Sequence, residues 1–237
     1  MTLDLVVANA TAFWTIVAES RGHAVTTRPG FVCVHGSERS GMRIVLRTAT
    51  PSADEVAELT ELAKNAPTVL VEDAYGTVDM SLLGLTSRQL PVMTRTGPGF
   101  GELSALRADT PDLLATVETV VVHGFPLGRH QPYVRGEVFP PALLERDGVA
   151  TWLVTRDDEP AGACLVIDDG AAVGLYWVTT LPAHRSRGVG RALMHTVLSQ
   201  VDGRTVTLTA AKPGKPLYDS LGFTTVGSAT WWSRASL

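Results

Sequence analysis

The sequence predicts an α+β protein: a mixed, mostly antiparallel sheet with flanking helices, arranged as two similar halves in tandem. Three observations support this fold class. Short β-rich runs separated by turn residues occur in both halves of the chain, helix-capping signals also occur in both halves, and a Gly/Pro-rich segment, 97–101 (GPGFG), lies between them. A length of 237 residues accommodates two small domains, and we expect them over residues 1–105 and 106–237.

The first half opens with apolar residues at helical spacing over Leu3–Glu19, and Gly22 is expected to end this helix. Three short runs then predict an antiparallel meander: Ala24–Thr27, Phe31–His35 and Met42–Leu46. Ser52 and Glu55 have the spacing of a capping box, which predicts the start of a second helix. A strand at Thr68–Val71, a short helical segment at Leu82–Leu85 and a strand at Gln89–Thr94 should follow. Pro91 in the last strand indicates a sheet edge or a bulge.

The second half opens with a helix that Thr110 caps and Pro111 begins, and it should end near Gly124. Three strands are predicted after it, at Ala150–Arg156, Ala161–Ile167 and Ala171–Val178. The remaining expected elements are a helix over Gly188–Gln200, a strand at Thr205–Thr209, a brief helix at Leu217–Leu221 and a final hairpin made of Phe223–Val226 and Thr230–Ser233.

Composition excludes several classes of protein. The formal net charge of −4 gives no electrostatic argument for a nucleic-acid partner. The N-terminus lacks the basic region of a signal peptide, and no apolar run is long enough for a membrane span, so we expect a cytoplasmic protein. Cys33 and Cys164 lie in apolar strand-like runs, which indicates buried free thiols, and the six histidines lack metal-ligand spacing.

The segment from Gly174 to Leu198 carries the most specific chemistry. An apolar strand leads into Arg185–Ala192, which fits the pattern R-x-x-G-x-G, and an amphipathic helix follows. The first turn of a helix presents unpaired N–H groups and a partial positive charge, so it binds anions. Gly188 and Gly190 lack a Cβ and allow a pyrophosphate to lie on the backbone, while Arg185, Arg187 and Arg191 add donors.

Other phosphate-binding motifs do not fit this chain. Leu193 occupies the place of the third glycine in a dinucleotide fingerprint, and Pro216 after Gly214-Lys215 excludes a P-loop. A tight turn with a solvated basic rim remains the alternative to an anion site.

The chain resembles the GNAT family of acetyl-CoA-dependent N-acetyltransferases from Val178–Pro182, through the loop, to Leu217–Phe223 (LYDSLGF), and the resemblance covers roughly residues 148–227. It implies that the backbone of Val178, Thr179 and Thr180 pairs with the pantetheine arm. It implies that the pyrophosphate is bound by Ser186, Arg187, Gly188, Val189, Gly190 and Arg191. Tyr218 would be the general acid. An asparagine that many relatives place before the tyrosine helix is missing here, where the segment reads Ala210–Lys215.

The resemblance implies acetyl-CoA as co-substrate, no metal, and direct attack by a primary amine of a small molecule or peptide. A backbone N–H, that of Val178, could polarise the thioester carbonyl. A non-catalytic acyl-CoA-binding regulatory module is the alternative function, a structural role is the alternative for Tyr218, and a homodimer stays open. The general base is unassigned among His123, Tyr176, Glu137 and His130. Trp152, Trp177, Trp231 and Trp232 are candidates for an acceptor pocket or for the core.

The first half has elements of similar size and order but no R-x-x-G-x-G. We interpret it as a degenerate GNAT-like domain, with an unrelated α+β cap over the substrate pocket as the alternative.

Overall fold

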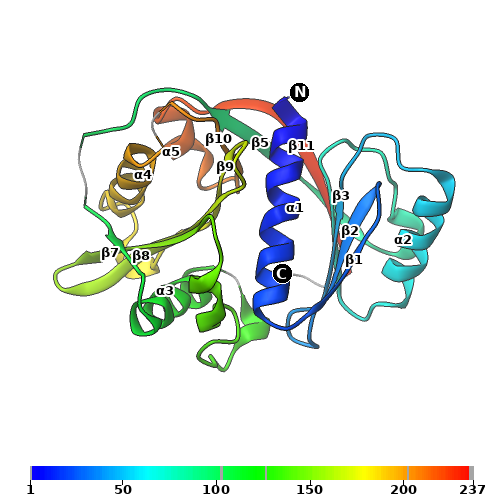
Figure 1. Ribbon diagram of the computed structural model, residues 1–237, viewed down its shortest axis with the longest axis horizontal. Coiled ribbons are helices and arrows are strands. Elements are labelled where there is room, and N and C mark those ends of the chain that lie inside the picture. Colours follow the sequence, from blue (N-terminus) through cyan, green and yellow to red (C-terminus); the bar gives the residue numbers. More distant parts are fainter. Residues whose placement is uncertain (1, 102–103, 126, 202, 235–237) are drawn as a thin grey trace.

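A computed structural model describes residues 2–101, 104–125, 127–201 and 203–234 (Figure 1). The helices in this part of the chain are α1 (Thr2–Ser20), α2 (Ala53–Asn65), α3 (Pro111–Gly124), α4 (Val189–Ser199) and α5 (Lys215–Ser220). Short 3-10 turns are η1 (Ser81–Leu83), η2 (Gly128–His130), η3 (Pro141–Glu145) and η4 (Pro182–His184). None of the described helices is both long and apolar enough to cross a lipid bilayer.

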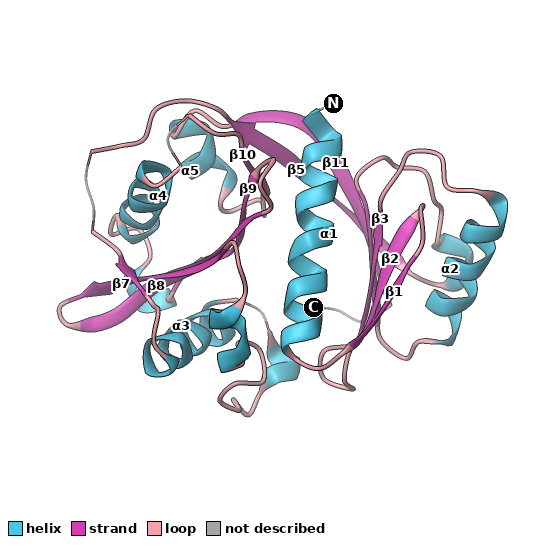
Figure 2. Cartoon of the chain, in the orientation of Figure 1, coloured by secondary structure: helices cyan, strands magenta, loops and turns pink. Residues whose placement is uncertain are grey.

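The strands form one sheet of eleven members in the order β1-β2-β3-β4-β11-β5-β10-β9-β8-β7-β6. Those of the first half are β1 (Ala24–Thr27), β2 (Phe31–His35), β3 (Met42–Leu46), β4 (Val69–Asp73) and β5 (Thr86–Arg95). Those of the second half are β6 (Leu106–Arg107), β7 (Val149–Arg156), β8 (Glu159–Asp168), β9 (Val173–Thr180), β10 (Val206–Thr209) and β11 (Thr224–Ser233). The secondary structure is mapped onto the chain in Figure 2.

The two halves repeat one pairing pattern. In the first, β1, β2 and β3 pair antiparallel and β3 pairs parallel with β4; in the second, β7, β8 and β9 pair antiparallel and β9 pairs parallel with β10. The parallel step needs a crossover, and α2 provides it in one half as α4 does in the other. The predicted fold class, a mixed and mostly antiparallel sheet in two similar halves, is confirmed.

The halves exchange their last strands, which the sequence did not predict. Residues of β5 pair with β10 of the second half, and β11 pairs with β4 of the first half and with β5. The predicted C-terminal hairpin is therefore wrong, because Thr224–Ser233 is one strand with a register shift between Thr225 and Gly227. Pro91 does not mark an edge, since β5 lies between β11 and β10. The bulge that it also indicated is present next to it, because the register shift of β11 lies opposite Val92 and Met93.

Helix α1 lies in the angle between the two half-sheets and contacts strands of both (Figure 1). Its Asn9 is fully buried and donates to the carbonyls of Ile167 and Ala172, while the Tyr176 hydroxyl donates to Asn9 Oδ1 at 2.6 Å. One turn later Phe13 stacks on the Tyr176 ring at 3.7 Å. The helix therefore joins the halves by hydrogen bonds inside an apolar interface.

Two separate cores cover the faces of the second half-sheet. Buried side chains of α4 and α5 pack with Leu175, Val206 and Leu208 on one face, and α3 packs with α1 and Leu165 on the other. Cys33 and Cys164 are free and buried, as predicted, and burial raises the pKa of both thiols. Each half of the molecule thus has apolar support of its own.

Candidate functional site

The candidate site begins where β9 leads into α4. Gly188 precedes the helix with a φ of 81°, a left-handed conformation that favours glycine, and no side chain caps the helix there. The first backbone bond of this turn runs from Ala192 N–H to the Gly188 carbonyl. In the part of the chain that the structure describes, the N–H groups of Val189, Gly190 and Arg191 have no acceptor. These are the donors that an anion can satisfy.

Gly190 has almost no free space around its α-carbon. A Cβ built there would lie 3.2 Å from Leu217 Cδ2 and 3.6 Å from Thr180 Oγ1. Glycine at this position therefore allows the first turn of α4 to pack closely against Leu217 of α5 and Thr180 of β9.

The three arginines of the loop differ in their contacts. Arg185 donates from Nε to the Thr180 carbonyl at 3.3 Å and from Nη2 to the Gly124 carbonyl at 3.2 Å, so it braces the loop. Arg191 Nη2 donates to Ser220 Oγ at 2.9 Å. The Arg187 side chain is exposed and has no protein partner among the described residues. All three arginines are exposed and none is paired with a carboxylate among the described residues, but only the Arg187 side chain is also without a hydrogen bond there.

Strands β9 and β10 separate soon after they meet. Their parallel pairing comprises Val206 with Val173 and Thr207 with Gly174. Further along β9 the register with β8 shifts, so that Trp177 and Val178 have no paired residue, and Trp177 has a φ of 49°. The Trp177 side chain then joins the α1/α3 core while Val178 packs with the α4 core. A bulge at the end of a splayed pair exposes backbone groups to a ligand.

Tyr218 lies in α5 beside this opening. The residue is 7% exposed and packs in the α4 core, with its ring 5.7 Å from that of Phe223. Burial, with a smaller contribution from Cys164, raises the pKa of the phenol above its ordinary value. Its hydroxyl makes no hydrogen bond with any residue that the structure describes. A proton on this oxygen is retained at neutral pH and is not committed to a structural partner.

The four candidates for the general base are in different settings. The Tyr176 hydroxyl is committed to Asn9, and exposed His123 has Nδ1 2.8 Å from the Thr119 carbonyl of its own helix. His130 and Glu137 lie together, with Nδ1 3.5 Å from Oε1. The structure therefore brings two of the four candidates together. No group of three or more His, Cys, Asp and Glu positioned to hold a metal occurs among the described residues.

The four candidate tryptophans lie in different parts of the fold. Trp152 and Trp232 pack in the cores on the α4 and α2 sides. Trp231 lies near Arg43 in the first half, whose guanidinium is 5.6 Å from the ring. Trp177 alone of these four lies at the β9 bulge. Lys215, at the start of α5, is ion-paired with Asp219 at 2.8 Å.

Residues 147–225 match the family profile described as the acetyltransferase (GNAT) domain. A segment of 69 residues is 42% identical to a mycothiol acetyltransferase of Clavibacter sepedonicus; it covers 28% of this chain and 22% of that protein. The match thus spans about a fifth of the curated relative's length.

Solved structures resemble the whole chain. A GCN5-related N-acetyltransferase from Kribbella flavida superposes with a TM-score of 0.66 at 14% identity, covering 98% of this chain and 96% of that one. A tandem GNAT protein from the clavulanic acid biosynthesis pathway gives a TM-score of 0.53 at 14% identity, covering 86% of this chain and 77% of that one. At such identities the likeness concerns the fold, and it extends over both halves.

Proposed function

We propose that this chain, whose C-terminal half belongs to the GNAT acetyltransferase family, transfers the acetyl group of acetyl-CoA to a primary amine of a small molecule or peptide. The observation that carries the proposal is the uncapped N-terminus of α4, with three free N–H groups, next to the opening between β9 and β10. A pyrophosphate needs such donors, and a thioester arm needs an accessible strand edge.

The residues present fit acetyl-CoA. The unbonded amides at Val189–Arg191 suit the pyrophosphate, and the exposed loop Ser186–Gly188 with Arg187 adds donors and charge. The backbone of Val178, Thr179 and Thr180, at the bulge and beyond, would pair with the pantetheine arm. The same loop and strand would thereby hold both the pyrophosphate and the pantetheine arm of the co-substrate.

Acetyl-CoA supplies an acetyl group activated as a thioester. The neutral amine nitrogen bonds to the acetyl carbon, the carbon–sulfur bond breaks, and the nitrogen loses one proton to water as the amide forms. Positioning accounts for much of the rate. The N–H of Val178 would polarise the carbonyl oxygen. Tyr218 would give its proton to the departing thiolate, a role supported by its raised pKa and its unbonded hydroxyl.

We further propose that the first half, within residues 1–105, is a degenerate GNAT-like domain. The repeated strand pairing supports this interpretation, and the sequence there has no R-x-x-G-x-G. A cytoplasmic location and a homodimer stay predictions.

The test is an amine panel assayed for coenzyme A release and for N-acetylated product by mass spectrometry. It includes amino sugars, polyamines, arylalkylamines, short peptides and the acceptor of a mycothiol acetyltransferase, because the matched segment is from such an enzyme. Turnover with at least one amine supports the enzyme. A stoichiometric thermal shift with acetyl-CoA but no turnover across the panel would favour the non-catalytic binding module.

A further inference from the structure

The segment Gly128–Phe139, here called the acceptor-side loop, connects α3 to η3 on the side of β9 opposite α4. It starts near Gly124, where a Cβ would lie 2.5 Å from Thr179 Oγ1, and it ends at Phe139, whose ring is 5.1 Å from that of Trp177. Trp177 is the bulge residue that faces α1 and α3. A molecule that approaches the thioester from this side therefore passes the loop.

From within its own half, the loop is held by a buried carboxylate. Glu118 of α3 is fully buried and accepts hydrogen bonds from the N–H groups of Gly136, Val138 and Phe139 at 2.7, 2.7 and 3.1 Å. The Tyr133 hydroxyl donates to the same carboxylate at 2.9 Å. A carboxylate with four donors is well satisfied despite its burial, and it fixes one side of the loop.

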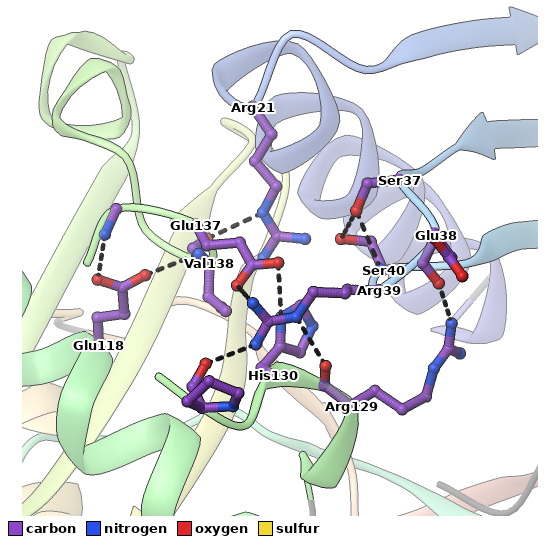
Figure 3. A network of polar contacts seen from close by, with 12 residues as sticks. Arg21, Ser37, Glu38, Arg39, Ser40, Glu118, Arg129, His130, Glu137 and Val138 are labelled. Atoms are coloured by element: carbon purple, nitrogen blue, oxygen red, sulfur yellow. Dashed lines mark hydrogen bonds and ion pairs between the residues drawn. The ribbon is translucent and has the colours of Figure 1, made fainter. Parts of the chain in front are cut away.

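From the other half, Arg39 reaches the opposite side of the loop (Figure 3). This side chain, from the turn between β2 and β3, donates from Nε to the Arg129 carbonyl and from Nη2 to the Pro132 carbonyl, both at 2.8 Å. Its Nη1 lies 3.0 Å from Glu137 Oε2. Arg129 in turn donates to the Glu38 carbonyl. One guanidinium therefore uses its planar fork to hold three points of the loop.

The contact with Glu137 places Arg39 next to a candidate base. His130 is 8% exposed, and its Nδ1 lies 3.5 Å from Glu137 Oε1, so the carboxylate bridges His130 and Arg39. Arg21 of α1 binds the next residue of the loop, donating from Nε to the Val138 carbonyl at 2.9 Å, and its guanidinium lies 5.7 Å from the Trp177 ring. Loss of the Arg39 contacts would free the backbone on both sides of His130, at Arg129 and Pro132, whereas Glu118 and Arg21 would still hold the backbone next to Glu137.

We propose that Arg39 is a positioning residue of the first half: it fixes the acceptor-side loop of the second half, and the first half thereby shapes the site that receives the acetyl group. This inference rests on the proposed acetyltransferase function for the identity of the site. The contacts of Arg39 themselves do not depend on that function.

Hydrogen–deuterium exchange of the full-length chain tests the positioning directly. In Arg39→Ala we expect exchange in residues 128–134 to accelerate roughly tenfold, while α4 and its loop stay unchanged. The matched control is Arg28→Ala, since Arg28 donates to both carboxylate oxygens of Glu58 and to the Thr27 carbonyl without leaving the first half. Arg39→Lys keeps the charge beside Glu137 but loses the fork, and we expect a smaller acceleration; it also serves if the alanine variant fails to fold.

Kinetics test the consequence, with the panel amine that wild-type enzyme acetylates fastest. We expect KM for this amine to rise about tenfold in Arg39→Ala, with KM for acetyl-CoA unchanged and the Arg28→Ala control like wild type. Exchange equal to that of the control, or faster exchange with an unchanged amine KM, would overturn the proposal. Wild-type protein that acetylates no amine would instead overturn the proposed function, and the exchange experiment alone would then decide whether Arg39 holds the loop.

Discussion

The crossover helices of the two halves begin in opposite ways. Helix α2 has a complete capping box, in which Ser52 Oγ accepts from Glu55 N–H and the Glu55 carboxylate accepts from Ser52 N–H, and the same carboxylate accepts from Gly30 N–H at 2.6 Å. Helix α4 has a left-handed glycine and no side-chain cap. The first helix carries its own anion at its N-terminus, whereas the second leaves the place for an external one.

The parallel strand pair of the first half, β3 and β4, is also more completely closed than that of the second half, β9 and β10. Four residue pairs join β3 to β4, but two join β9 to β10 before the strands part. A fully paired edge has no backbone groups to offer a pantetheine arm. The same strand-helix-strand arrangement is therefore closed in the first half and open in the second, where we propose that acetyl-CoA binds.

We expect substitution of Gly190, at the open start of α4, to have a greater effect on acetyl-CoA binding than any other change considered below. Gly190→Asp puts a Cβ 3.2 Å from Leu217 and a negative charge at the free amides, so acetyl-CoA binding should be lost. Isothermal titration calorimetry measures it, with circular dichroism to verify the fold. A folded variant that still binds acetyl-CoA with wild-type affinity would show that the pyrophosphate does not bind at the start of α4.

Substitution of Tyr218 is expected to lower the rate of acetyl transfer without weakening acetyl-CoA binding. Tyr218→Phe should lower kcat by about 100-fold while the Kd for acetyl-CoA barely changes, because the role proposed for the phenol is to protonate the leaving thiolate. The raised pKa means that the acid form persists as pH rises, so the wild-type rate should not fall through loss of this proton below about pH 10. Normal turnover in the variant would leave Tyr218 a structural residue.

A smaller effect is expected at Arg187, the arginine of the loop without a protein partner. Arg187→Ala should weaken acetyl-CoA binding by about three- to tenfold and reduce its dependence on salt concentration. Titrations at low and high ionic strength provide the test. An affinity equal to wild type at both would show that the charge does not meet the phosphates.

Removing the cap of α2, in the first half, should change stability only slightly and leave acetyl-CoA binding unaffected. Ser52→Ala removes the cap of α2 and should lower the free energy of unfolding by about 1 kcal/mol, with no change in acetyl-CoA affinity. Urea unfolding and calorimetry measure the two quantities. A changed affinity would mean that the first half communicates with the cofactor site through this helix.

Local signals in the sequence predicted most elements and the glycine turn at the start of α4. The capping box at Ser52 and Glu55 is present, Thr110 accepts from Leu113 N–H as a cap, and the glycine turn opens α4 as expected. These features depend on neighbours within four residues, so periodicity and residue type suffice to find them.

Features that depend on distant partners were missed. The exchange of β5 and β11 follows from pairing across more than a hundred residues. Gly227–Ala229 between two β-rich runs has the pattern of a hairpin turn, so the local sequence favours a hairpin over one continuous strand. Asn9, Glu118 and Arg39 likewise gain their roles from partners far along the chain. The one available signal was a polar residue, such as Glu118, on the apolar stripe of a helix.

The number of acetyl-CoA molecules bound per chain tests the contrast between the halves most directly. Isothermal titration calorimetry of the wild-type protein should give one site, and hydrogen exchange should show protection at Val178–Arg191 and none at the start of α2. Two sites per chain, or protection of residues 50–56 on binding, would contradict the account of one open half and one closed half.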